Sequence, residues 1–64
     1  MDWANFQNKI CSFDLESDEN GDIFAIGAVF QGQVFQRKAP FNIRQVLNEF
    51  DNFAKNAEFL LGHN

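Results

Sequence analysis

The stretch IFAIGAVFQGQVFQRK, residues 23–38, decides the fold because it predicts two strands joined by a tight turn. Its first half, IFAIGAVF, is apolar on both faces, which is typical of a central strand covered on both sides. Gln31 and Gly32 form the turn, and residues 34–38 form a returning strand. The charges that end this second strand suit a sheet edge, where they discourage unwanted pairing. A β-hairpin is therefore expected in the middle of the chain.

Another strand is expected before the hairpin, over residues 9–15, with a turn-rich loop over residues 17–22 between them. Side chains alternate between the faces of a strand, so Asp14 and Glu16 should leave the same face. An apolar strand that ends on two carboxylates could simply be reaching solvent. It could also be presenting ligands to a metal ion, and the sequence pattern alone leaves both interpretations open.

A helix is expected after the hairpin, because Asn42 is a good N-cap and apolar residues recur at helical spacing over residues 43–57. The short apolar run at residues 59–61 is then a last strand, which is expected to end at Gly62. The predicted order is β-β-β-α-β, an α/β (α+β-like) mixed sheet with one helix on one face. Such a helix allows the last strand to pair parallel with the first through a right-handed crossover.

One helix covers only one face of a sheet, whereas a complete domain packs its layers so that the apolar faces are buried. We therefore expect the 64 residues to be part of a domain. We expect an N-terminal arm at residues 1–8 and the N-terminal half of a domain at residues 9–64. The uncovered face should bind a second copy, the remainder of the domain or another chain.

The composition narrows the possible classes of protein. A chain of 64 residues with 45% hydrophobic and 16% aromatic residues is too apolar to be disordered, yet so small that its stability should be marginal. A net charge of −4 provides no basic stripe for nucleic acid, so metal ions or further chain would have to supply positive charge. Cys11 is expected in the core. No apolar run approaches the ~20 residues of a membrane helix, and the cytoplasm is the expected location.

Asp14 and Glu16, here called the acidic pair, are candidate ligands for a divalent metal ion. Two carboxylates on one strand face repel each other unless a cation lies between them. Hard oxygen ligands of this kind suit Mg²⁺ or Mn²⁺, which bind one or two carboxylates together with water and substrate phosphate. The alternative is that Asp14 and Glu16 open a solvated acidic loop that continues with Asp18, Glu19 and Asp22.

Three short motifs, in this order and spacing, carry a resemblance: FDLE at residues 13–16, IGAV at residues 26–29 and LLGHN at residues 60–64. Together they resemble the start of a DnaQ-like 3′–5′ exonuclease of the DEDD group, on the ribonuclease H-like fold. The sequences of the FDLE and LLGHN motifs are most similar to those of exonuclease domains joined to bacterial RecQ-type DNA helicases. The resemblance covers residues 9–64 and the first half of that family's domain.

The resemblance implies roles for individual residues. Asp14 would bridge two Mg²⁺ or Mn²⁺ ions about 4 Å apart and Glu16 would bind one of them, so both are catalytic and metal-binding candidates. Asn64 would help to position substrate. His63 would anchor the loop that follows it, because the family's catalytic histidine lies in a later motif. Ser17 takes no role, since this chain has Ser-Asp-Glu where many members have Thr-Thr-Gly.

The implied reaction is metal-dependent hydrolysis of a nucleic-acid 3′ end, with DNA preferred to RNA. Two further acids and the base would come from the remainder of the domain, so the 64-residue chain alone is expected to be inactive. The alternative is a non-catalytic interaction or oligomerisation module with an exposed apolar sheet face.

Overall fold

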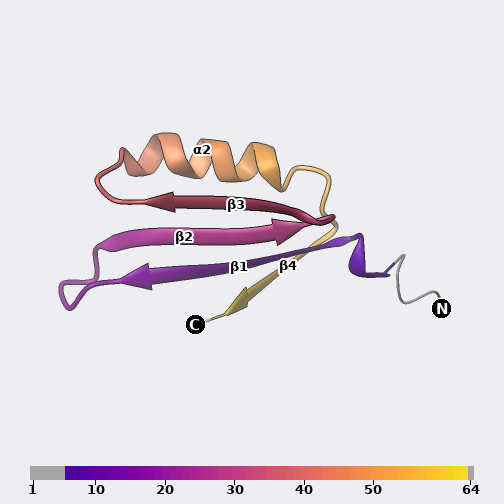
Figure 1. Ribbon diagram of the computed structural model, residues 1–64, viewed down its shortest axis with the longest axis horizontal. Coiled ribbons are helices and arrows are strands. Elements are labelled where there is room, and N and C mark those ends of the chain that lie inside the picture. The colour runs from indigo at the N-terminus through magenta and orange to yellow at the C-terminus, as the bar shows by residue number, and fades with distance from the viewer. Residues whose placement is uncertain (1–5, 64) are drawn as a thin grey trace.

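The computed structural model describes residues 6–63, which form one four-stranded mixed sheet and a helix (Figure 1). The elements follow the predicted order: β1 (Ile10–Ser17), β2 (Ile23–Phe30), β3 (Gln33–Lys38), α2 (Ile43–Phe53) and β4 (Phe59–His63). In space the strands lie in the order β3-β2-β1-β4. The first three pair antiparallel, and β4 pairs parallel with β1, which confirms the predicted crossover pairing.

The hairpin forms as its sequence predicts. Gln31 and Gly32 both have positive φ, at 53° and 77°, the conformation of a type I′ turn. Phe30 and Gln33 are direct partners on either side of it, so the turn contains two residues. The right-handed twist of such a turn matches that of the flanking strands, and this sets the register between β2 and β3.

The core lies between α2 and one face of the sheet. Val46 and Phe50 of α2 pack against β-strand residues of the same cluster, Cys11, Ile26, Ala28, Phe30 and Phe35. Phe50 lies at the centre of the aromatic contacts, with ring centroids 5.6 Å from Phe13 and 6.0 Å from Phe35. Cys11 is fully buried, and burial raises the pKa of its thiol, so it is a core residue as expected.

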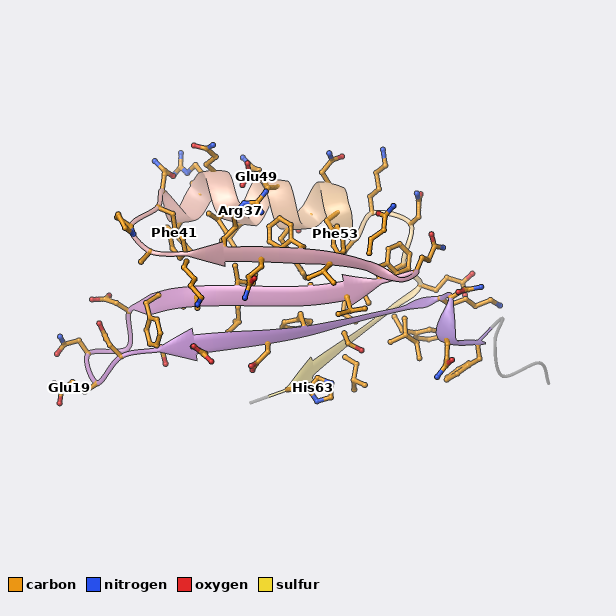
Figure 2. All side chains as sticks on the ribbon, viewed as in Figure 1. Glu19, Arg37, Phe41, Glu49, Phe53 and His63 are labelled. Atoms are coloured by element: carbon orange, nitrogen blue, oxygen red, sulfur yellow. The ribbon has the colours of Figure 1, made fainter. Side chains whose placement is uncertain are left out.

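An ion pair also connects α2 to the edge strand β3. Arg37 of β3 donates a hydrogen bond to Glu49 of α2 at 3.1 Å, and its guanidinium lies 4.4 Å from the centroid of the Phe35 ring. Figure 2 shows Arg37 and Glu49 facing each other between β3 and α2. Both side chains are partly exposed, so the pair should stabilise the fold by no more than about 1 kcal/mol.

Several element boundaries differ from those predicted. β1 begins at Ile10 instead of residue 9, and β3 begins at Gln33 instead of residue 34. β1 continues to Ser17 because its pairing with β2 extends through Glu16, so the acidic pair lies within the strand. α2 ends at Phe53, where a turn over residues 54–57 replaces the last predicted helical turn. β4 extends to His63, because pairing with β1 continues to Asp14. Of the predicted arm only residues 6–8 are described, and the ring of Phe6 lies 6.2 Å from that of Phe59.

The N-cap of α2 provides a stability test. The Asn42 side chain accepts a hydrogen bond from the Gln45 backbone N–H at 3.1 Å. Asn42→Ala should therefore lower the free energy of unfolding by about 1 kcal/mol, measured by urea denaturation. Asn48→Ala, at an exposed position inside α2, is the matched control and should be neutral or slightly stabilising. Equal losses in the two variants would contradict a capping role.

Candidate functional site: the acidic pair on the open face

The sheet face away from α2, here called the open face, is largely uncovered within residues 6–63: only residues 6–8 adjoin it, at the end where Phe6 contacts Phe59. Its residues follow from strand alternation and the register, and they are Ile10, Ser12, Asp14, Glu16, Ala25, Gly27, Val29, Val34, Gln36, Lys38, Phe59, Leu61 and His63. Val29 at 49% and Val34 at 73% exposure show how open this surface is. The expectation that β2 is covered on both sides thus holds, among residues 6–63, for one face only.

The register divides the open face into a polar end and an apolar end. One row across the sheet contains Lys38, Ala25 and Glu16, and the next contains Gln36, Gly27, Asp14 and His63. The following row, which runs from Val34 to Leu61, is mostly apolar. All the charges of this face therefore lie together, at the end of β1 that carries the FDLE motif.

Asp14 and Glu16 leave the same face of an inner strand of the sheet, as alternation predicts. Both are exposed, and within residues 6–63 neither carboxylate takes part in a hydrogen bond or an ion pair. Their oxygens are therefore free to accept a ligand. Because the acidic pair is held by strand pairing on both sides at Asp14, it belongs to a rigid element and not to the following loop.

The loop acids behave differently. Asp18 closes its own turn, because its Oδ1 accepts hydrogen bonds from the backbone N–H groups of Asn20 at 2.9 Å and Asp22 at 3.0 Å. The strand acids and the loop acids are thus structurally distinct, which weakens the interpretation that Asp14 and Glu16 merely open an acidic loop.

His63 is the direct partner of Asp14 in the parallel pairing of β1 with β4. It lies on the open face at the side of the sheet away from α2 (Figure 2). The FDLE and LLGH segments, about 50 residues apart in sequence, therefore lie side by side. Asn64, the candidate substrate contact, lies outside the described residues.

Two shallow hollows adjoin the acidic pair. One, of about 300 Å³, is lined by open-face residues that include Asp14, Gly27, Gln36 and His63. The other, of about 220 Å³, includes Glu16 and Lys38. A Cβ on Gly27 would have the Phe35 carbonyl oxygen as its nearest neighbour, at 4.0 Å. Because glycine has no side chain, the space beside Asp14 in these hollows stays open. Sequence reasoning missed Gly27, Gln36 and Lys38 as site residues.

The donor set fits part of a metal centre. Two unpaired carboxylates on one face are suitable ligands for a single hard cation that keeps most of its water. Among residues 6–63, however, no group of three or more His, Cys, Asp or Glu side chains is close enough to hold a metal ion. His63 therefore does not complete a three-ligand site with the acidic pair, and a two-metal centre would need ligands from elsewhere.

Comparisons with known proteins identify no relative of this chain. No protein-family model matches the chain, and no curated protein or solved structure matches it either. Over the described part of the chain, no helix has the length and apolar character needed to cross a membrane.

Proposed function

We propose that this chain is the N-terminal part of a metal-dependent 3′–5′ exonuclease domain of the DnaQ-like type, which hydrolyses nucleic-acid 3′ ends and prefers DNA. The observation that carries the proposal is the placement of Asp14 and Glu16: free, on one face of an inner strand, beside the strand that ends in LLGH. The β-β-β-α-β order agrees with the arrangement expected for the start of such a domain.

In this proposal Asp14 and Glu16 hold Mg²⁺ or Mn²⁺ at the polar end of the open face. A bound divalent cation would activate water and stabilise the charge that develops on a phosphodiester. The chain's own contribution is positional. Strand pairing fixes the two carboxylates, Gly27 leaves space beside Asp14, and Lys38 adds a positive charge to the adjoining hollow.

Arg37 is not available for such a role, because it is engaged with Glu49 and Phe35 on the opposite face. The open face thus offers one cation against two carboxylates, and a polyanion would be repelled without bound metal. This charge balance agrees with an acidic protein whose contact with nucleic acid depends on divalent ions.

The test is a Mn²⁺ titration of the 64-residue chain, followed by NMR. Paramagnetic broadening should begin at the backbone amides around Asp14 and Glu16, before it appears in the loop of residues 18–22. Asp14→Asn should abolish this selectivity, whereas Asp51→Asn, on an exposed position of α2, should leave it intact. Broadening that starts in the loop, or that survives Asp14→Asn, would contradict the proposed site.

The isolated chain should nevertheless show no nuclease turnover with Mg²⁺ or Mn²⁺. Two carboxylates cannot hold two divalent ions and a substrate, and among the described residues no further His, Cys, Asp or Glu side chain forms a three-ligand group with them. EDTA-sensitive cleavage of a single-stranded oligonucleotide by the purified 64-residue chain would show that this assignment of an incomplete site is wrong.

The second candidate function is a non-catalytic interaction module that binds a partner through the apolar end of the open face. The exposure of Val29, Val34 and Leu61 favours it, because contiguous apolar surface on a small soluble domain marks an interaction site. A chain without a selective Mn²⁺ response that still binds its partner through these residues would favour the module over the nuclease.

A further inference from the structure

The loop that joins β1 to β2 contains an asparagine followed by a glycine, Asn20 and Gly21. Within residues 1–64 no other asparagine is followed by glycine. All of residues 17–22 are exposed, and Figure 2 shows Glu19, the neighbour of Asn20, at the outer end of the loop. The hydrogen bonds that close the loop are all made within residues 18–22, so its conformation is set locally and does not depend on what adjoins the sheet.

The side chain of Asn20 is free while its backbone is held. The Asn20 N–H donates to Asp18 Oδ1 at 2.9 Å, but within residues 6–63 the Asn20 carboxamide makes no hydrogen bond. Gly21 follows with a φ of 84°, in the left-handed region that favours glycine. An exposed carboxamide thus lies next to a backbone nitrogen that no side chain shields.

We propose that Asn20 is a site of spontaneous deamidation, and that opening of the loop limits the rate of this reaction. The proposal is independent of the exonuclease proposal, because it involves no metal ion and neither carboxylate of the acidic pair.

The reaction needs only the chain and water. The backbone nitrogen of Gly21 loses its proton and attacks Cγ of Asn20, and the side-chain nitrogen leaves as ammonia. The product is a cyclic succinimide. Water then breaks one of the two C–N bonds of the ring: cleavage at Cγ gives aspartate, and cleavage at the backbone carbonyl carbon gives isoaspartate, whose main chain runs through the former side chain. Either route replaces an amide by a carboxylate and adds one negative charge to the net −4 of the chain.

Asn56 provides a comparison that isolates the effect of the glycine. It is also exposed, in the turn that follows α2. At both sites the next residue donates its N–H to the backbone carbonyl three residues before it, at 3.0 Å for Gly21 and 2.9 Å for Ala57. The sites therefore differ mainly in the Cβ of the attacking residue. This Cβ crowds the ring closure, whereas glycine lets the backbone approach closely.

The closed loop slows the attack. The Gly21 N–H donates to the Asp18 carbonyl, so this hydrogen bond must break before the nitrogen can lose its proton and attack. The Asp18 carboxylate stabilises the turn, because its Oδ1 accepts hydrogen bonds from the backbone N–H groups of Asn20 and Asp22. The reaction therefore proceeds from local openings of the loop, and its rate measures how often the loop opens.

Isoaspartate changes the loop itself. It adds one carbon to the main chain between the N–H groups of residues 20 and 22, and Asp18 Oδ1 can then no longer accept from both of them in the present geometry. The strand register shifts between Glu16 and Ser17, so this irregularity separates the loop from the regular pairing of β1 with β2. We expect the product to change residues 17–23 and to leave the rest of the sheet intact.

The first test is prolonged incubation of the 64-residue chain at mildly alkaline pH, followed by NMR of the side-chain NH₂ groups. The Asn20 signal should disappear at least an order of magnitude faster than the Asn56 signal of the same sample. Trypsin releases Asn20 in the fragment of residues 10–37, where it is the only asparagine, and this fragment should give way to two products of equal mass. Persistence of the Asn20 signal over several weeks, or loss at the Asn56 rate, would overturn the proposal.

Two variants test the control by the loop. Asp18→Ala removes the acceptor of two hydrogen bonds and should speed the loss of the Asn20 signal by about fivefold or more, the factor that one hydrogen bond of average net strength provides. Asp22→Ala removes the same charge but no side-chain hydrogen bond, and should leave the rate nearly unchanged. The Asn56 rate in each variant detects any global unfolding. Equal rates in the two variants would overturn the proposed control.

Discussion

Replacing Phe50 by alanine should leave most of the 64-residue chain unfolded at 25 °C. Phe50 is buried at the centre of the aromatic core, with its ring packed edge-on to both Phe13 and Phe35. Truncation of a buried Phe costs about 3–5 kcal/mol in lost burial and cavity formation. At about 0.05–0.15 kcal/mol per residue, a domain of this length has a total stability of roughly 3–10 kcal/mol, and the small surface that such a short chain buries places it at the low end of that range. Loss of most of the signal at 222 nm by circular dichroism is the expected result.

The control for this prediction lies one helical turn away. Leu47 is 45% exposed, so Leu47→Ala should cost about 1 kcal/mol or less and leave the chain folded. Both variants must be compared at one protein concentration, because any association stabilises the folded form by mass action. Equal costs for the two substitutions would mean that the packing of α2 on the sheet differs from the described core.

The core was predictable because its signals are local. The apolar spacing of α2, the Asn42 cap and the Gln31-Gly32 turn each depend on residues within a few positions of one another, and all three occur in the structure. The helix ended one turn early although Ala54 and Ala57 continue its apolar stripe. Both still pack against the core from the turn, so burial alone does not distinguish a helix from a turn that follows the same surface.

The site was predictable only in part. The placement of Asp14 and Glu16 on one face follows from alternation, which needs no knowledge of other strands. The pairing of Gly27 with Gln36 could have been counted from the two-residue turn, because Phe30 and Gln33 fix that register. The pairing of Asp14 with Gly27 could not, because the length and closure of the intervening loop depend on the hydrogen bonds of Asp18.

Two adjacent residues of β3 should respond oppositely to the same substitution. Phe35 is 5% exposed and packs against Phe50 and Phe53, whereas Val34 is 73% exposed on the open face. Phe35→Lys should unfold the chain, because it removes a core ring and forces an ammonium group into an apolar site without a partner. Val34→Lys should change the free energy of unfolding by no more than about 0.5 kcal/mol. Urea denaturation of both variants measures the difference.

This contrast bears directly on what the open face does. If the face is free in the folded chain, a lysine at position 34 adds a cation at the apolar end, two residues before Gln36 beside the acidic pair, and stability is unaffected. If another copy or a further part of the fold already covers the face, the same lysine becomes a buried charge and costs several kcal/mol. A strongly destabilised Val34→Lys would therefore remove the premise that Asp14 and Glu16 are accessible to a metal ion and its substrate.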